Sequence, residues 1–292
     1  MPHTKSPLRY PGGKTQLWKF VKSTIELNRI NEPIYCEPFA GGSGVTIELL
    51  LGNHAKEVII NDFDPAIYSF WNMSINYSKD FIDLIRQTPV TLDEWHNQKR
   101  IYLEHGNNPE SLLGAFSTFF LNRTNVSGII SGGPIGGQSQ SGKYKIDCRF
   151  NKETSINKII RIAENKNRIH LYNEDAADLV DLLKKQYSKE KLFTFFDPPY
   201  FVQGQSLYLS FYKENQHEIM RNKILSMDDF FWILTYDKAP QISELYSCVE
   251  NTFQYSLHYS ANRKRLANEF MFASSKTKLH STQKVELLPI IE

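Results

Sequence analysis

The sequence predicts a mixed α/β protein with a doubly wound, mostly parallel sheet that is interrupted by an inserted module. Three observations carry this prediction. Short apolar runs alternate with helical runs on both sides of the centre of the chain. Several of these apolar runs end in an acidic residue or a glycine-rich turn, which is typical of strands that lead into ligand-binding loops. Between the two sets lies a long region of helical runs and clustered glycines that interrupts the alternation.

The first strand–helix–strand unit begins with the apolar segment 34–37. A glycine-rich turn follows it, and residues 45–51 have the apolar pattern of a helix. Glycines at the end of a strand let the backbone approach a ligand closely, and the following helix offers free N–H groups. The next apolar run, 58–60, ends near Asp62, where an acid can accept both hydroxyls of a ribose. The glycine spacing is not GxGxxG, so a dinucleotide is not favoured, and a turn without any ligand is the alternative.

Two later strands are predicted at 192–196 and 230–235, and the first leads directly into Asp197, two prolines and Tyr200. The prolines fix a rigid turn and remove two backbone donors. The carboxylate of Asp197 and the carbonyl of Pro198 then form a row of acceptors that suits an exocyclic amino group. The tyrosine ring suits a planar base stacked against it. A purely structural turn is the alternative interpretation of these four residues.

The N-terminal segment 8–14 has the sequence LRYPGGK and precedes a helical run at 16–27. Its Pro-Gly-Gly sequence predicts a turn. Lys14 lies near the start of the helix, where it could hold a carboxylate. Alone, this pattern favours a terminal turn with a solvated lysine.

The central region is predicted to be rich in loops. Six of the 15 glycines lie between Gly128 and Gly142, after a run at 111–123 with apolar residues at helical spacing. Clustered glycines predict a long loop or a hairpin tip rather than packed core. Long irregular loops in compact domains are usually functional or mobile.

Composition limits the class of protein further. The 292 residues suffice for one large domain or two modest ones. The 34 Lys and Arg and 32 Asp and Glu residues give a net charge of +2, so a surface for nucleic acid would have to be local. The three cysteines have no CxxC spacing, which favours a reducing compartment and indicates no metal site. The N-terminus lacks the apolar run of a signal peptide and no stretch has the length of a membrane span, so we expect a soluble, cytoplasmic protein.

Three motifs together resemble those of a known enzyme family. LRYPGGK at 8–14, EPFAGGSG at 37–44 and DPPY at 197–200 stand in the order found in Dam-type DNA adenine-N6 methyltransferases, the alpha group of the D12 class. Segments 232–237 and 259–274 also resemble late motifs of this family. The resemblance covers most of the chain.

The resemblance implies a Rossmann-like fold in which residues 1–78 and 166–292 form a catalytic domain that binds S-adenosylmethionine. Residues 79–165 would form an inserted target-recognition domain, with helices and a β-hairpin that bind double-stranded DNA. S-adenosylmethionine is then the methyl donor, and no metal is expected. The residues that match the family's cofactor-binding positions are Tyr10, Lys14, Glu37, Phe39, Gly41, Gly42, Asp62, Asp175 and Asp197.

The resemblance also implies the chemistry. The target adenine has to leave the base stack, because the duplex hides its N6 atom. Asp197 and Pro198 would hold the amino group and Tyr200 would stack on the flipped base, so these three are the predicted catalytic residues. Transfer of the methyl group is then direct, and positioning supplies much of the acceleration. A covalent intermediate of the cytosine-C5 type is not expected, because no cysteine follows a proline.

Residues 122–128 resemble the NRxxxNG element that leads into the family's DNA-reading hairpin. Ser127 stands where asparagine is usual, and Ser131 stands where Dam-type proteins carry an arginine. Because Arg and Asn read guanine and adenine edges, these departures do not support a GATC target. The predicted DNA-binding residues are Arg123, Asn125, Lys143 and Lys145. The two lysines fit phosphate contacts or solvated charges better than base reading.

Several alternatives stay open at this point. A cytosine-N4 methyltransferase attacks a similar exocyclic amine, although Asp at the first position of DPPY favours adenine by family usage. An RNA or protein-amide methyltransferase is a further alternative. A DNA-binding module of the same fold without catalysis is the alternative from another class, and the intact motif residues count against it. The sequence also leaves open a functional pairing with a restriction endonuclease.

Overall fold

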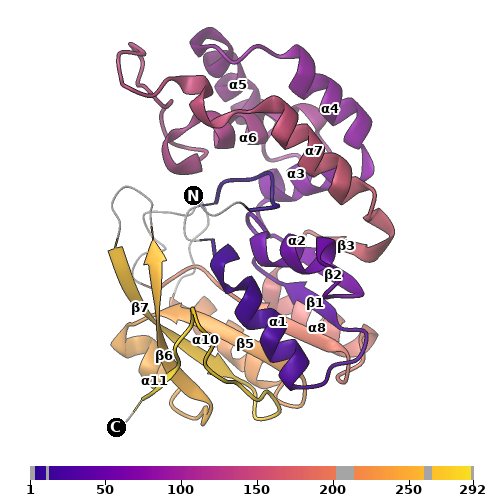
Figure 1. The fold of residues 1–292 in the computed structure, drawn as a ribbon, viewed down its shortest axis with the longest axis vertical. Helices are drawn as coiled ribbons and strands as arrows, with labels where there is room; N and C mark the ends of the chain where they lie inside the picture. Colours follow the sequence, from indigo (N-terminus) through magenta and orange to yellow (C-terminus); the bar gives the residue numbers. More distant parts are fainter. Residues whose placement is uncertain (1–3, 11–12, 202–213, 260–264, 291–292) are drawn as a thin grey trace.

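The computed structural model describes residues 4–10, 13–201, 214–259 and 265–290 (Figure 1). Within these residues the centre of the molecule is an eight-stranded sheet with the order β3-β2-β1-β4-β5-β7-β6-β8. Strands β1 to β5 run parallel, whereas β7 is antiparallel to β5 and β6, and β8 is antiparallel to β6. The strands are β1 Ile34–Glu37, β2 Glu57–Asn61, β3 Ile169–Tyr172, β4 Leu192–Phe196, β5 Phe231–Asp237, β6 Thr252–Tyr259, β7 Arg265–Ala273 and β8 Leu288–Pro289.

The strand order confirms a doubly wound, Rossmann-like sheet. From β1 the chain winds outward through β2 and β3 on one side, and it then returns to β4 and β5 on the other side. The direction of winding therefore reverses between β1 and β4. Open α/β sheets bind ligands at such a reversal, in the crevice beside the carboxyl ends of the strands.

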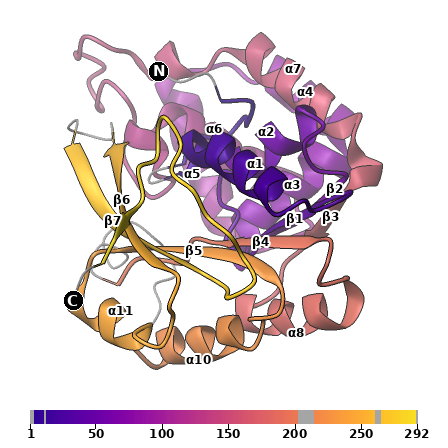
Figure 2. The ribbon, with the colours of Figure 1, turned by 60° about the horizontal axis from the view of Figure 1, so that its bottom comes forward.

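Alternate residues of the buried strands point to opposite faces of the sheet. Tyr35, Phe193 and Ile233 pack into one hydrophobic cluster, and Cys36 and Trp232 pack into the other. Helices cover both faces (Figure 2), as a doubly wound sheet requires. They are α1 Trp18–Leu27 and α2 Gly44–Leu51 on the first face, and α8 Ala176–Gln186, α10 Glu214–Leu225 and α11 Pro240–Leu245 on the second.

A helical module lies between β2 and β3 in the chain and occupies the upper part of Figure 1. Its helices are α4 Ser78–Gln87, α5 Leu92–His105, α6 Leu112–Thr124 and α7 Lys152–Ala163, and α3 Pro65–Asn76 joins the module to the sheet. Most residues of α6 are buried, so this helix is the centre of the module. The predicted insertion at residues 79–165 begins within the first turn of α4 and ends after α7.

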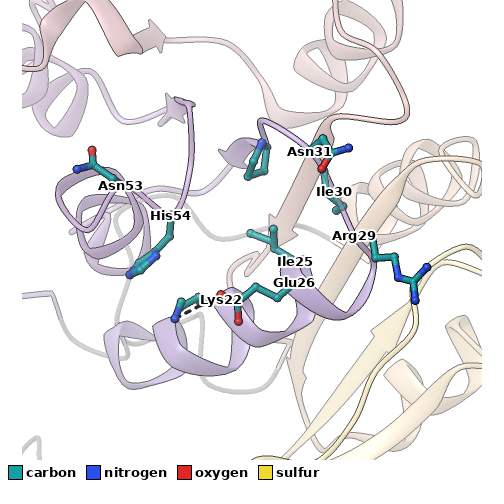
Figure 3. Close-up of a pocket in the computed structure, with 9 residues that line it drawn as sticks. Lys22, Ile25, Glu26, Arg29, Ile30, Asn31, Asn53 and His54 are labelled. Carbon is teal, nitrogen blue, oxygen red and sulfur yellow. Dashed lines mark ion pairs between the residues drawn. The ribbon is translucent and has the colours of Figure 1, made fainter.

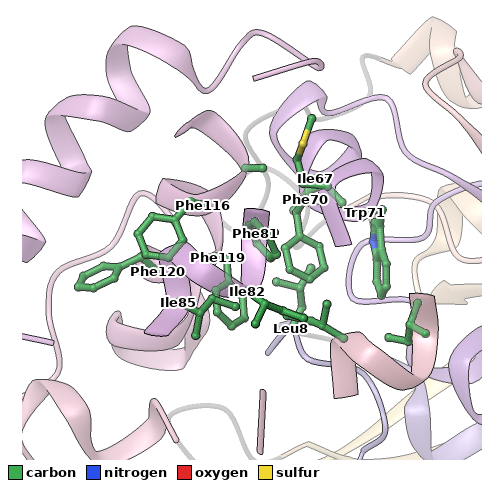
Figure 4. Close-up of a cluster of buried hydrophobic side chains, with 14 of the residues drawn as sticks. Leu8, Ile67, Phe70, Trp71, Phe81, Ile82, Ile85, Phe116, Phe119 and Phe120 are labelled. Carbon is green, nitrogen blue, oxygen red and sulfur yellow. The ribbon is translucent and has the colours of Figure 1, made fainter. Parts of the chain in front are cut away.

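Aromatic side chains connect the module to the rest of the protein (Figure 4). Phe70 of α3 stacks on Phe119 of α6, with ring centroids 5.6 Å apart, and meets Phe81 of α4 edge-on at 5.8 Å. The same cluster contains Leu8 from the N-terminal segment and Ile60 from β2. Because this core is continuous across residue 78, the division of the chain into two domains remains a prediction.

The region between α6 and α7 is a long loop. The sequence predicts a long loop or a hairpin here, but the described chain from residue 125 to 150 holds only 3₁₀ turns and one isolated antiparallel bridge, between Asn125 and Pro134. The side-chain amide of Asn125 donates to the backbone carbonyls of Ile129, Ile130 and Gly132. A side chain therefore occupies carbonyls that would otherwise be available to a paired strand, and the hairpin part of the prediction is replaced by a loop.

No helix among the described residues is long and apolar enough to cross a membrane. In the same part of the chain, no group of three or more His, Cys, Asp or Glu side chains is placed to hold a metal ion. All three cysteines are free thiols, of which Cys36 is buried and the other two are exposed.

Candidate active site

Five acidic residues lie at or just beyond the carboxyl ends of the five parallel strands. They gather on the side of the sheet that these strand ends form, which is called the carboxyl edge below. Glu37 and Asp237 are the last residues of β1 and β5, while Asp62, Asp175 and Asp197 lie just beyond β2, β3 and β4. Carboxyl ends of parallel strands meet at the same edge, so the fold brings these five carboxylates together. Of the five, Asp237 is not among the predicted site residues, and its carboxylate accepts the backbone N–H of Phe201 at 3.0 Å.

The N-terminal segment packs against the glycine-rich turn after β1. A Cβ atom added to Gly41 would lie 2.6 Å from the ring of Tyr10, and one added to Gly42 would lie 2.7 Å from the Cβ of Tyr10. Gly41 also has φ = +45°, a conformation that side chains rarely adopt. The two glycines thus make room for Tyr10. Pro11 and Gly12 of the same motif lie outside the described residues.

Glu37 is a buried carboxylate at the end of β1, with 7% of the residue exposed. It accepts hydrogen bonds from the hydroxyl groups of Tyr35 at 2.9 Å and Ser43 at 3.1 Å. Burial raises the pKa of Glu37 to about 7, although these hydrogen bonds act in the opposite direction. A positive charge or a further hydrogen-bond donor beside Glu37 would lower its pKa again. Phe39, two residues further on, packs partly buried against the cluster on the α8 face.

Asp62 connects β2 to the glycine-rich turn. One carboxylate oxygen accepts the N–H of Gly41 at 2.7 Å, and the other accepts the N–H of Asp64 at 3.0 Å. Burial and the charge of Asp64 raise the pKa of Asp62 to about 7. Each carboxylate oxygen has a second lone pair, so Asp62 can still accept the hydroxyls of a ligand. Asp175 caps helix α8 by accepting the N–H of Ala177 at 2.8 Å, and this leaves it a second oxygen.

Asp197, the first residue of DPPY, is held by groups from two other segments. Its Oδ1 atom accepts a hydrogen bond from the hydroxyl of Thr235 at 2.8 Å and forms an ion pair with Nζ of Lys14 at 3.1 Å. The Lys14 ammonium also donates to the Tyr200 hydroxyl and lies 4.6 Å from the centroid of that ring. Burial raises the pKa of Asp197, whereas the charge of Lys14 lowers it. Lys14 is therefore a buried partner of the DPPY motif, not the solvated lysine that its motif alone favours.

A second carboxylate contacts Lys14 and was not predicted. Glu269 of β7 lies 3.6 Å from Nζ of Lys14 and accepts the hydroxyl of Tyr255 at 2.6 Å. The residue is 1% exposed. Its one sequence signal is that it is an acid directly before the apolar segment 270–273. A buried carboxylate needs a positively charged or hydrogen-bonding partner. Glu269 could therefore have been recognised as a paired residue once β7 was known to lie inside the sheet.

The turn after β4 rests on the neighbouring strand β5. The rings of Tyr200 and Tyr236 are tilted against each other with centroids 6.5 Å apart. The Tyr236 hydroxyl is 2.7 Å from Nδ1 of the buried His217 of α10, and the His217 ring lies against Phe201. Pro198 is buried. The aromatic contacts fix the position of the turn that carries the predicted catalytic residues.

The predicted DNA-binding residues fall into two groups. Asn125 is fully buried, and in addition to its bonds to the loop it accepts the indole N–H of Trp95 at 2.6 Å. Arg123 is partly buried and donates to the backbone carbonyls of Pro7 and Arg149. Both side chains point into the protein, which corrects their assignment as direct DNA contacts. Lys143 and Lys145 are exposed on the loop.

A surface groove lies away from all the predicted site residues (Figure 3). It runs between α1 and the turn before β2, where Glu26 forms an ion pair with Lys22 at 3.4 Å. Its lining includes Pro33, the residue before β1, so the groove is at the amino end of that strand. None of the predicted site residues lines it. The groove is therefore at the opposite edge of the sheet from the acidic cluster.

Comparison with known proteins identifies the family of the chain. The chain matches the model of D12 class N6 adenine-specific DNA methyltransferases over residues 10–265. It is 26% identical over 206 residues to the Type II methyltransferase M.MjaIII of Methanocaldococcus jannaschii, in an alignment that covers 66% of this chain and 68% of that protein. A solved structure from Pyrococcus horikoshii, assigned as an RNA methyltransferase, is 10% identical with a TM-score of 0.42 and covers 94% of this chain and 87% of the other. The family match covers the motifs at 37–44 and 197–200 and begins within the N-terminal motif at residue 10, and the chain belongs to the D12 class of N6 adenine-specific DNA methyltransferases.

Proposed function

We propose that the carboxyl edge of β1, β2 and β4 binds S-adenosylmethionine and presents to it an adenine that has left the stack of duplex DNA. Methylation of adenine N6 in DNA is the reaction of the family. What we propose beyond this reaction is the binding of the cofactor at this edge, the flipping of the base and the roles of the individual residues. The observation that supports it most is the position of Asp197, which is held by Thr235 and Lys14 beside Pro198 and Tyr200.

The residues at this edge fit S-adenosylmethionine by their chemistry. The cofactor carries an ammonium group, a positively charged sulfonium and two ribose hydroxyls, and when bound it supplies an electrophilic methyl group. Glu37 and Asp62 are carboxylates of raised pKa, whose burial is unfavourable until a positive or hydrogen-bond-donating group approaches. Glu37 would line the methionine side together with Phe39, Gly41 and Gly42. Asp62 would accept the ribose hydroxyls and Asp175 would lie near the adenine, with Tyr10 and Lys14 completing the site.

Asp197 and Pro198 would orient the substrate amine. The carboxylate and the proline carbonyl each accept one hydrogen of the amino group, and this directs the nitrogen lone pair toward the methyl group. As the new N–C bond formed, the bond between the methyl group and the sulfonium would break and leave a neutral thioether. The nitrogen would become positively charged and release one proton, which Asp197 could accept. The ring of Tyr200 would stack on the base and restrict its orientation. Fixed orientation of the reacting groups contributes a large part of the acceleration in reactions of this type.

The long loop between α6 and α7 would approach the DNA. Lys143 and Lys145 are exposed there and would contact phosphates. Asn125 and Arg123 would act on DNA only indirectly, by holding the loop in shape. The relative from Methanocaldococcus jannaschii is named a Type II methyltransferase. That name supports the further proposal that this enzyme modifies the target sequence of a companion restriction endonuclease.

The proposal is tested by identifying the methylated nucleoside. The protein is incubated with S-adenosylmethionine labelled in its methyl group and duplex DNA of mixed sequence, and the DNA is then digested to nucleosides. Label is expected in N6-methyladenine for the native protein and to be absent for Asp197→Ala. The matched control is Asp229→Ala, an exposed acid at the amino end of β5, which should retain activity. Label in N4-methylcytosine would overturn the target base, and label in no nucleoside despite cofactor binding would overturn the DNA substrate.

A further inference from the structure

We propose that Glu269 is a positioning residue for methyl transfer, which holds the Lys14 ammonium against one oxygen of Asp197 and leaves the other oxygen for the substrate amine. The inference rests on the proposed function of Asp197. It adds a residue from the antiparallel part of the sheet to a site whose other carboxylates lie at the ends of parallel strands.

The register of the sheet brings Glu269 to this position. Strand β7 lies between β5 and β6, and it pairs Glu269 with Asp237 on one side and Tyr255 on the other. Directly paired residues of antiparallel strands project from the same face. Tyr255 can therefore donate its hydroxyl to Glu269 at 2.6 Å, and Lys14 reaches the same carboxylate at 3.6 Å from the segment before α1.

The ammonium group of Lys14 is shared by the carboxylates of Asp197 and Glu269. The side chains of Lys14 and Glu269 are 4% and 2% exposed, whereas that of Asp197 is 25% exposed. Removing one partner from a buried group of charges leaves the others without compensation. Glu269 thus anchors the lysine from the interior, and Asp197 is the member of the three that can meet a substrate.

Thr235 and Lys14 both contact the same oxygen of the Asp197 carboxylate, as a positioned hydrogen-bond acceptor requires. Within the part of the chain that the structure describes, Thr235 and Lys14 both bind Oδ1. With Oδ1 held by two groups, the carboxylate is fixed in rotation and Oδ2 is the oxygen for the amino group. Glu269 prevents Lys14 from pairing with Asp197 alone, so that the carboxylate stays a good hydrogen-bond acceptor.

The charges of Lys14 and Glu269 shift the pKa of Asp197 in opposite directions. Lys14 lowers the pKa of Asp197, and Glu269 raises it. Among the described residues, the other titratable groups that face this site include Glu37 and Tyr35 from β1, Asp237 from β5, Tyr255 from β6, and Tyr200 from the DPPY turn itself. Replacing Glu269 or Lys14 by a neutral residue should therefore shift the acid limb of the pH–rate profile to lower or higher pH, respectively. If Glu269 only stabilised the fold, its replacement would not move the acid limb to lower pH.

The test uses Glu269→Gln, which keeps the shape of the side chain and removes its charge. The rate constant of a single turnover is measured with labelled S-adenosylmethionine at saturating DNA, beside the cofactor Kd and the Tm. We expect a rate constant lower by roughly 10- to 100-fold with a Kd changed by less than about threefold, because misplacement of reacting groups slows the chemical step. The acid limb should move to lower pH in Glu269→Gln and to higher pH in Lys14→Met. Tyr255→Phe removes only the hydroxyl that fixes Glu269, and it should lower the rate by about two- to fivefold.

The matched control is Glu48→Gln. Glu48 of α2 is likewise a buried glutamate paired with a lysine, Lys5, at 3.1 Å, and it has no contact with Asp197 among the described residues. Its rate should stay within about twofold of the native protein. An unchanged rate in Glu269→Gln, or a loss with no shift of the acid limb, would overturn the inference while the proposed function stands. If Glu269→Gln does not fold, Tyr255→Phe decides, and an unchanged rate in that variant would overturn the inference. Absence of adenine methylation by the native protein would overturn the proposed function, and this inference with it.

Discussion

The side chain of Asn122 pairs with the backbone of Arg9 through two hydrogen bonds. The N–H of Arg9 donates to Oδ1 of Asn122 at 2.8 Å, and Nδ2 of Asn122 donates to the Arg9 carbonyl at 2.6 Å. The same Nδ2 donates to the carbonyl of Gly128 at 2.9 Å. One buried amide at the end of α6 therefore joins the N-terminal motif to the first turn of the long loop.

The N-terminal segment also reaches the carboxyl edge of the sheet. The hydroxyl of Ser6 donates to the carbonyl of Gly42 at 2.5 Å, and Tyr10 packs on Gly41 and Gly42. Lys158 of α7 donates to the carbonyl of Ser6 at 3.0 Å. Residues 6–10 thus connect the glycine-rich turn to both ends of the loop region, and a disturbance at Asn122 is expected to reach both.

Replacing Asn122 by alanine should destabilise the fold. The change leaves the N–H and carbonyl of Arg9 and the carbonyl of Gly128 without this partner, and each buried unsatisfied group costs about 1–3 kcal/mol. Because water can reach part of this segment, we expect a total loss of roughly 2–4 kcal/mol in the free energy of unfolding. Urea denaturation measures it. Asn107→Ala, at an exposed asparagine before α6, is the control and should change stability by less than about 0.5 kcal/mol. Equal stability of the two variants would contradict the assigned role.

The two lysines of the loop should contribute to DNA binding through salt-dependent contacts. Each of Lys143→Ala and Lys145→Ala is expected to reduce the slope of log K against log salt concentration by about 1, because one phosphate contact is lost. Fluorescence anisotropy with duplex DNA at several salt concentrations measures this slope. Lys189→Ala removes an exposed lysine at the opposite edge of the sheet and should leave the slope unchanged. A slope that is the same in all three variants would show that the loop lysines are only solvated charges.

The sequence was sufficient to predict the edge of the sheet at which the acids meet. Glu37, Asp62 and Asp197 each closely follow an apolar run, so the alternation of strands and helices is enough to align them. Glu269 could not be found in this way, because it meets Lys14 only through the register of an antiparallel strand. Asn125 is predicted to bind DNA because residues 122–128 resemble the family's element before the DNA-reading hairpin, but its amide suits a backbone carbonyl as well as a base edge. Only the packing of the loop decides between these two uses.

Stability should depend on pH through Glu37. Its pKa is raised from 4.5 to about 7 in the folded protein, so the folded state binds the proton more tightly than the unfolded state does. The stabilising contribution of the protonated form is fully present below pH 4.5 and is lost as the pH rises through 7. Glu37→Gln imitates the protonated form, so its stability relative to the native protein should increase by up to roughly 3 kcal/mol across this range. Chemical denaturation of the cofactor-free proteins at several pH values measures the difference. A difference that does not vary with pH would contradict the raised pKa.

Replacing Gly41 by alanine should destabilise the glycine-rich turn for two separable reasons. The new Cβ would lie 2.6 Å from the Tyr10 ring, and the residue would have to keep a φ of +45°. An unfavourable backbone conformation costs about 1–3 kcal/mol, and the displacement of Tyr10 adds to it. Gly133→Ala is the matched control, because a Cβ there has no atom within 4 Å and should be nearly neutral. In the double variant Tyr10→Ala/Gly41→Ala the steric part of the loss should disappear, so that the two changes together cost less than the sum of the single changes. Additive losses would mean that the backbone conformation alone requires glycine, and that Tyr10 moves aside without cost.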